Sequence, residues 1–201
     1  MNKIRIILAS ALTTATLAAP AWAQGLSLGQ LSNYLNSFKS ASGEFTQIND
    51  DGTISTGQIY IKRPGRVRFE YNPPEKTLVV ADGSTVGVID PKSNTGPEGY
   101  PLNKTPLKII LARKVDFSRA RMVTGHKSDG KTTTVRAQDP EHPEYGSIDL
   151  VFTGNPVELR QWVINDSSGS QTTVILGDLK KNVQLGNDKF VIPGLGANTR
   201  N

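Results

Sequence analysis

Residues 57–71 have the sequence GQIYIKRPGRVRFEY, and this stretch decides the fold class. Apolar side chains occupy every second position in both halves, with polar, charged or tyrosine side chains between them. That period of two is typical of a β-strand with one buried face. Pro64-Gly65, between the halves, favours a tight turn. The stretch therefore predicts a β-hairpin whose apolar face consists of Ile59, Ile61, Val67, Phe69 and Tyr71.

The rest of the chain continues this pattern of short strands separated by Gly-, Pro-, Asn- and Asp-rich turns. A further strand is expected at residues 172–176, and no strand–helix–strand alternation favours a parallel sheet. The sequence therefore predicts a mainly β (α+β) fold of antiparallel strands, as a sandwich or a barrel. Two more apolar stripes contribute to its core: Ile148, Leu150 and Phe152, and Val157, Leu159 and Val163.

Two helices are expected outside the sheet. The first begins near Ser27, which forms a plausible capping box with Gln30, and its apolar stripe is Leu28, Leu31, Leu35 and Phe38. The second is short and covers residues 105–111, with Thr105 as N-cap and Pro106 at the first helical position. Its apolar stripe is Leu107, Ile110 and Leu111. The Pro- and Gly-rich residues 91–101 before it predict a flexible surface loop.

The N-terminus has the features of a secretory signal peptide. Lys3 and Arg5 precede the apolar residues 6–19, and Ala21-Trp22-Ala23 supplies a small-x-small cleavage signal. The apolar segment is shorter than the about 20 residues that span a bilayer, which argues against an uncleaved anchor. We therefore expect residues 1–23 to be removed on export, leaving residues 24–201 as a single domain in the periplasm.

Composition excludes several classes of function. The chain has no cysteine, so it forms neither disulfides nor thiolate sites. Without Lys3 and Arg5, 21 basic residues face 18 acidic ones, and this net charge of +3 is scattered rather than clustered as in nucleic-acid-binding proteins. His126 and His142 do not have the spacing of metal ligands, and no nucleophile or phosphate-binding motif is present. We expect no enzyme activity, no cofactor and no metal.

The apolar face of the sheet remains as the candidate functional feature. The same residue types line a ligand cavity and fill an ordinary core, so periodicity alone leaves both interpretations open.

Several motifs, in this order and spacing, resemble the family of periplasmic outer-membrane lipoprotein carriers, LolA. The Lys62-Arg63-Pro64 element followed by an aromatic strand is the most specific of them. The resemblance covers nearly all of residues 24–201 and is densest from Phe45 to Ala112. The motifs are Phe45-Thr46-Gln47, residues 57–64, Phe69-Glu70-Tyr71, Pro74, Val80-Ala81-Asp82-Gly83 and residues 105–112.

The resemblance implies an unclosed antiparallel β-barrel with helices covering an apolar cavity. It implies that Arg63 contacts this lid and couples its opening to cargo transfer, and that Leu107, Ile110 and Leu111 belong to the lid helix. The implied cargo is an acylated lipoprotein, received from an inner-membrane ATP-driven release complex and passed to an outer-membrane receptor. The implied cavity lining is Phe45, Ile59, Ile61, Val67, Phe69, Tyr71, Ile148, Leu150 and Phe152.

The chain departs from the family pattern at Val67, where a larger aromatic side chain is common, and this predicts a less bulky lining. A monomer is expected, because a gated cavity needs no partner subunit. Two rival functions stay open: a carrier of this fold for another lipid or apolar molecule, and a periplasmic adaptor for a protein partner with a filled core. A hydrolase that uses His126 or His142 ranks third.

Overall fold

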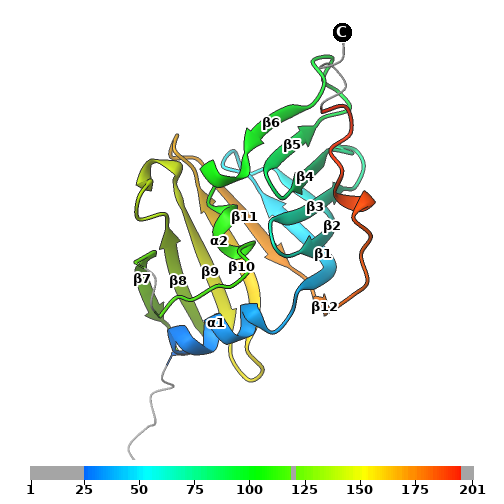
Figure 1. Ribbon diagram of the computed structural model, residues 1–201. Helices are drawn as coiled ribbons and strands as arrows, with labels where there is room; N and C mark the ends of the chain where they lie inside the picture. The colour runs from blue at the N-terminus through cyan, green and yellow to red at the C-terminus, as the bar shows by residue number, and fades with distance from the viewer. Residues whose placement is uncertain (1–24, 119–120, 196–201) are drawn as a thin grey trace, which may run out of the picture.

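Twelve antiparallel strands form one sheet in the computed structural model, which describes residues 25–118 and 121–195 (Figure 1). The predicted signal peptide lies outside the described residues. The strands are β1 (Ser40–Ile48), β2 (Ile54–Lys62), β3 (Arg66–Tyr71), β4 (Leu78–Asp82), β5 (Thr85–Ile89), β6 (Glu98–Pro101), β7 (Val123–Ser128), β8 (Thr132–Gln138), β9 (Ser147–Thr153), β10 (Glu158–Asn165), β11 (Gln171–Leu176) and β12 (Lys180–Lys181).

The sheet is long, curved and open. Its strand order is β6-β5-β4-β3-β2-β1-β11-β10-β9-β8-β7, and β12 pairs with β1 beyond the end of β11. Within the described residues no pairing joins the edge strands β6 and β7, so the barrel does not close. This confirms the predicted fold class.

The hairpin of residues 57–71 forms as the sequence predicts. Ile59 lies opposite Phe69 and Ile61 lies opposite Val67 in the register of β2 and β3. All four side chains are at most 5% exposed. The period of two therefore does place one continuous apolar face toward the interior of the sheet.

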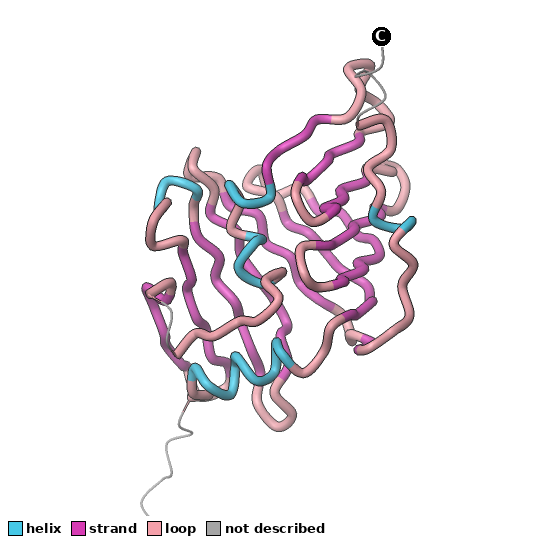
Figure 2. Tube along the Cα trace, in the orientation of Figure 1, coloured by secondary structure: helices cyan, strands magenta, loops and turns pink. Residues whose placement is uncertain are grey.

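Both α-helices lie on the same side of the sheet, as Figures 1 and 2 show. α1 (Leu28–Asn36) begins after the predicted capping box: the Ser27 hydroxyl accepts from the Gln30 amide, and the Gln30 side chain accepts from the Ser27 amide. Its buried apolar residues are Leu31, Tyr34 and Leu35, while Phe38 packs inward just beyond the helix end. No helix of the described residues has both the length and the apolar character needed to cross a bilayer.

α2 (Leu107–Ile110) is shorter than predicted and starts differently. Its N-cap is Pro106, not Thr105. A 3-10 turn, η1 (Leu102–Lys104), precedes it, and the Thr105 hydroxyl donates to the Leu102 carbonyl 2.9 Å away. Thr105 therefore closes the preceding turn and is not available to cap α2.

Part of the predicted surface loop is a strand. Residues 98–101 form β6, which pairs with β5 although all four of its residues are exposed. Exposed edge strands lack the apolar alternation on which the sequence prediction relied, and backbone pairing alone defines this one.

β10 contradicts one predicted stripe. The register shifts between Leu159 and Gln161, which is a β-bulge that adds one residue to β10. Leu159 and Trp162 are therefore buried, while Val163 is only half-buried. The prediction of Val163 on the apolar face was wrong, because simple alternation fails across a bulge.

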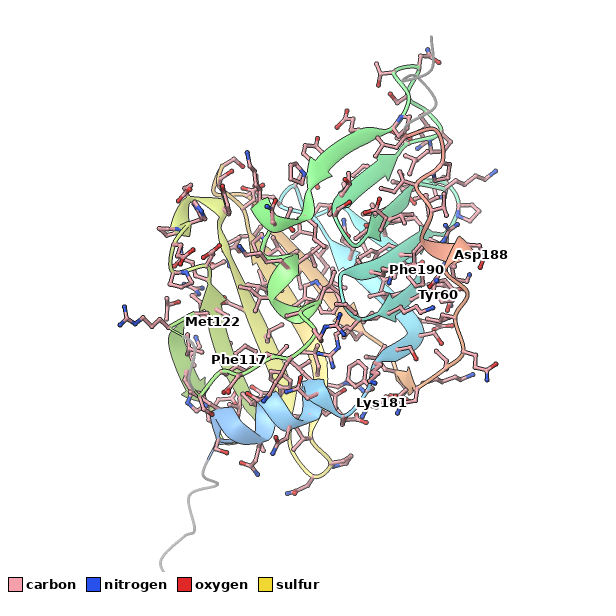
Figure 3. All side chains as sticks on the ribbon, viewed as in Figure 1. Tyr60, Phe117, Met122, Lys181, Asp188 and Phe190 are labelled. Carbon is pink, nitrogen blue, oxygen red and sulfur yellow. The ribbon has the colours of Figure 1, made fainter. Side chains whose placement is uncertain are left out.

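The opposite, outer face of the sheet has a small core of its own. The chain after β12 crosses β2–β5 on this face, and η3 (Asp188–Phe190) places Phe190 there beside Tyr60 (Figure 3). Val80, Phe190 and Ile192 are buried together. Ile192 lies directly over Gly87, where an added Cβ would come within 2.4 Å of its Cγ2.

Candidate functional site

The nine side chains predicted to line a cavity all face the inside of the curved sheet. Eight are at most 5% exposed, and Tyr71 is half-buried; all nine belong to or pack against one apolar cluster. The aromatic rings meet edge to face, with centroids 5.2 Å apart for Phe45 and Phe69 and 5.1 Å apart for Phe45 and Tyr71. The structure therefore brings the predicted residues together, and their contact with a ligand stays a prediction.

Two local features fix the position of these rings. Phe45 lies over Gly57, where a Cβ would meet its ring carbon Cε1 at 2.7 Å and the Glu70 carbonyl oxygen at 2.1 Å, so only glycine fits there. The Tyr71 hydroxyl donates to Gln47 Oε1 at 2.6 Å, and burial raises the pKa of this phenol to about 12. Tyr71 therefore stays neutral and directs its polar end to the rim of the cluster.

A helical cover occupies the inner face of the sheet; we use this name for α1 together with residues 107–118. The predicted lid residues Leu107, Ile110 and Leu111 are all buried, and so is Ile109, which the predicted stripe omitted. Phe117, in the turn at the end of the cover, is 1% exposed (Figure 3). In this structure the apolar side chains of the cover fill the space against the sheet.

The parts of the cover are tied to one another by hydrogen bonds. The Asn36 side chain donates to the Val115 carbonyl at 2.7 Å and accepts from the Val115 amide at 3.0 Å. The Ser32 hydroxyl accepts from the Phe117 amide at 2.9 Å. α1 and residues 115–117 are therefore linked as one unit.

Polar contacts also tie the cover to the sheet. On α2, Lys108 pairs with Asp139 after β8, and this hydrogen bond is the main reason that the pKa of the Asp139 carboxyl lies below its usual range, although partial desolvation of Asp139 opposes it. The Gly65 amide donates to the Leu111 carbonyl at 2.8 Å. Arg63, which follows β2, adds two hydrogen bonds to the end of α1, and Lys181 Nζ of β12 lies 4.3 Å from the centre of the Tyr34 ring. The other buried side chains of the cover are mostly apolar.

Arg63 is the polar contact at the end of α1. It follows β2, is 9% exposed, and donates through Nη2 to the carbonyl oxygens of Leu35 and of Phe38, the latter at 2.6 Å. Its guanidinium carbon lies 5.4 Å from the centre of the Phe38 ring. Arg63 therefore contacts the helical cover at the end of α1. That this contact is one with a lid, and that it couples opening to cargo transfer, as the resemblance implied, stays a prediction.

The electrostatic setting of Arg63 is unfavourable for a permanent contact. Desolvation lowers the pKa of the guanidinium, and no carboxylate of the described residues pairs with it. Carbonyl groups at the C-terminal end of a helix carry partial negative charge, which offsets part of this cost. Arg63 is therefore a desolvated cation that carbonyl oxygens alone hold in place.

Trp162 is a site residue that the sequence prediction missed. It is fully buried in the middle of β10, and its ring meets that of Phe69 from the opposite side of the interior, at 6.3 Å between centroids. The signal available in the sequence was its size: a tryptophan in a predicted strand is rarely left on the solvent face. The bulge in β10 hid its orientation.

Among the described residues, the inner face presents mainly apolar side chains together with a few unpaired hydrogen-bond donors. No cluster of three His, Asp or Glu side chains suitable for a metal occurs in residues 25–118 and 121–195.

Comparison with known proteins identifies the family. The sequence model described as "Outer membrane lipoprotein carrier protein LolA" matches residues 36–193. The chain belongs to the LolA family. A LolA-family relative from Pseudomonas syringae pv. tomato, named outer-membrane lipoprotein carrier protein, is 25% identical over 198 residues and is aligned over 94% of both chains. A relative of the same name from Cupriavidus taiwanensis is 27% identical over 201 residues, covering 94% of this chain and 93% of its own.

Among solved structures, a LolA superfamily protein from Nitrosomonas europaea superposes with a TM-score of 0.43 at 9% identity, covering 84% of this chain and 99% of its own. The match to the family spans the whole sheet from β1 to β11, together with the cover residues 107–118.

Proposed function

We propose that this LolA-family protein carries lipoproteins through the periplasm by holding their acyl chains against the inner face of the sheet. The observation that carries the proposal is the cover itself: a layer whose buried side chains are mostly apolar occupies the face that the family resemblance assigns to cargo. Acyl chains that displace this layer would meet the same side chains that now bind α1 and α2.

The free-energy cost of an acyl chain in water agrees with a carrier that works by burying the chain, without catalysis. A saturated chain of about 16 carbons costs roughly 12 kcal/mol in water, at about 0.8 kcal/mol per methylene. Burial against an apolar face removes this cost without a nucleophile, a base or a metal. The carrier must also release its cargo, and the competition between cover and acyl chains for one face lowers the net affinity to a reversible level.

Arg63 supplies a means of coupling in this scheme. Cargo that displaces the end of α1 breaks the hydrogen bonds from Arg63 to Leu35 and Phe38, so the desolvated cation loses its acceptors. That penalty favours return of the cover once the cargo leaves. The proposed donor and acceptor of cargo are an inner-membrane ATP-driven release complex and an outer-membrane receptor.

The test uses the single tryptophan of residues 24–201. Trp22 precedes the proposed cleavage site, so Trp162 is the only tryptophan of the exported form. A triacylated lipopeptide brominated in mid-chain should quench Trp162 fluorescence, because bromine quenches at short range. The unbrominated lipopeptide and the unacylated peptide should not.

A matched variant shows which face binds. In Trp162→Phe/Tyr60→Trp the only tryptophan lies on the outer face of β2, beside Phe190. At a lipopeptide concentration that saturates this variant in native mass spectrometry, its fluorescence should remain unquenched. Quenching of the outer tryptophan but not of Trp162 would refute the proposed site, and absence of acyl-dependent binding to the folded protein would favour the adaptor function.

A further inference from the structure

The interior contains hydrogen-bond donors without acceptors. In the part of the chain that the structure describes, three fully buried side-chain nitrogen or oxygen atoms lack a hydrogen-bond partner: Nε and Nη1 of Arg63, and Nε1 of Trp162. All three are donors. Buried polar groups are almost always paired in folded proteins, so an excess of one kind, confined to the site, calls for an explanation.

Trp162 is the more informative of the two residues. Its indole N–H belongs to a side chain with no measurable exposure, set among Leu150 and Val174 on the neighbouring strands and Phe69 across the interior. A phenylalanine would fill such a position without burying a polar atom. The β-bulge between Leu159 and Gln161 turns the Trp162 side chain inward, so this local feature of β10 places the indole in the interior.

We propose that the indole N–H of Trp162 donates a hydrogen bond to an acyl carbonyl oxygen of the cargo. This inference rests on the proposed function and names the polar contact within it. Ester groups accept hydrogen bonds and donate none, so they complement a site whose unpaired atoms are all donors. While the cover occupies the inner face, the indole N–H of Trp162 has no acceptor. The carbonyl oxygen of a bound acyl chain accepts a hydrogen bond from it.

Such a hydrogen bond gives the site a preference for acyl chains over alkyl chains, which apolar burial alone cannot give. Methylene groups bind wherever an apolar surface is offered, and their contact does not fix how deep a chain lies. A hydrogen bond to the carbonyl fixes the position of the head of the chain relative to β10. It also separates acyl chains from alkyl chains of equal length, since an ether oxygen is a poorer acceptor than a carbonyl oxygen.

The experiment compares two probes that differ only in these carbonyl groups. One is a diacylated lipopeptide with two ester-linked chains on its N-terminal cysteine and a free amine; the other is its dialkyl ether analogue with the same chain length. The protein is the full exported chain, residues 24–201. Its single tryptophan is replaced biosynthetically by benzothienylalanine, which keeps the size of indole and lacks the N–H.

The expected result is selective. The normal protein should bind the ester lipopeptide about fivefold more tightly than the ether analogue, the effect of about one net hydrogen bond. The benzothienylalanine protein should bind both equally, at the affinity of the ether. With ¹⁵N-indole tryptophan, the one indole cross-peak should move downfield with the ester probe only.

The alternatives are distinguishable. Equal affinities of the normal protein for the two probes, with an unmoved indole peak, would overturn the hydrogen bond while leaving the carrier function intact. Failure of both probes to bind would reject the proposed function itself. The free energy of unfolding of the unliganded protein should not fall on replacement, because the N–H has no acceptor there; a clear loss would mean that the indole N–H is paired in the free protein and would also overturn the proposal.

Discussion

The contacts of Arg63 are visible only in the folded structure and could not be read from its position in the sequence. Beside Pro64-Gly65 it is a charged residue next to a turn, and the family resemblance alone singled it out. The structure buries it under the end of α1, in contact with two carbonyl oxygens. Two of its three side-chain nitrogens stay unpaired, so its contribution to global stability should be small even though it contacts the cover.

Replacing Arg63 tests that distinction. Arg63→Met should change the free energy of unfolding in urea by less than about 1 kcal/mol, because an apolar side chain of similar length often replaces a buried charge without loss. The exchange rate of the Ser37 amide, which donates to the Tyr34 carbonyl at the end of α1, should rise about tenfold or more, since charged hydrogen bonds contribute about 1.5–3 kcal/mol.

Arg66→Met on the outer face of β3 is the control for Arg63, and it should leave Ser37 exchange unchanged. A loss of several kcal/mol in Arg63→Met with normal exchange at Ser37 would contradict the assignment of Arg63 to the cover.

At the scale of elements, α2 shows the limits of local sequence signals. The three residues of its predicted apolar stripe are buried, but the stripe omitted Ile109, and the predicted N-cap was wrong because Thr105 bonds to the turn before the helix. A helix of four residues has little stability of its own, so packing and the Lys108–Asp139 pair hold it in place. The β10 bulge makes the same point for strands: a one-residue insertion moved Trp162 inward and Val163 outward.

The Lys108–Asp139 pair should make the cover sensitive to acid. The pKa of Asp139 is lowered in the folded protein, so the pair stabilises α2 above the ordinary carboxyl pKa of about 3.9 and is lost as the pH falls through the lowered value. Asp139→Asn should therefore speed exchange of the Ile109 and Leu111 amides about two- to fivefold at pH 6. This difference from the normal protein should shrink toward pH 3.

Asp178→Asn is the matched control for Asp139→Asn, because Asp178 is 97% exposed and pairs with Arg160, remote from α2 in sequence. It should leave exchange in α2 unchanged at every pH. A difference at Ile109 and Leu111 that persists undiminished at pH 3 would show that the charge of Asp139 is not what holds α2.

At the scale of the whole molecule, the two faces of the sheet pack against different segments of the chain. The inner face meets the cover, and the outer face is sealed over β2–β5 by the chain that follows β12 (Figure 3). Lys62 bonds this segment through the Leu185 carbonyl at 2.6 Å and Asn187 Oδ1 at 2.7 Å. On the proposed mechanism, we therefore expect the outer core to stay folded when cargo replaces the cover on the inner face.

Phe190→Ala should separate stability from cargo binding. Phe190 is 1% exposed, and truncation of a buried phenylalanine costs about 3–5 kcal/mol, measured by urea unfolding. Quenching of Trp162 by the brominated lipopeptide should be normal under conditions where the variant is folded. Val191→Ala, at a neighbouring side chain that is 62% exposed, should cost less than about 0.5 kcal/mol. Loss of cargo binding in folded Phe190→Ala would show that the two faces are coupled.

The sequence by itself determined the hairpin of β2 and β3, the antiparallel class, the capping box of α1 and the apolar character of nine inward positions, because each depends on residues close together in the chain. The tertiary structure alone decided which side Trp162 faces, that Arg63 lies under α1, and that the cover fills the inner face. These depend on a bulge, on the pairing of β1 with β11 far along the chain, and on which apolar surface meets which. Local periodicity predicts that one face of a strand will be buried. Only the tertiary structure determines which segment of the chain packs against that face.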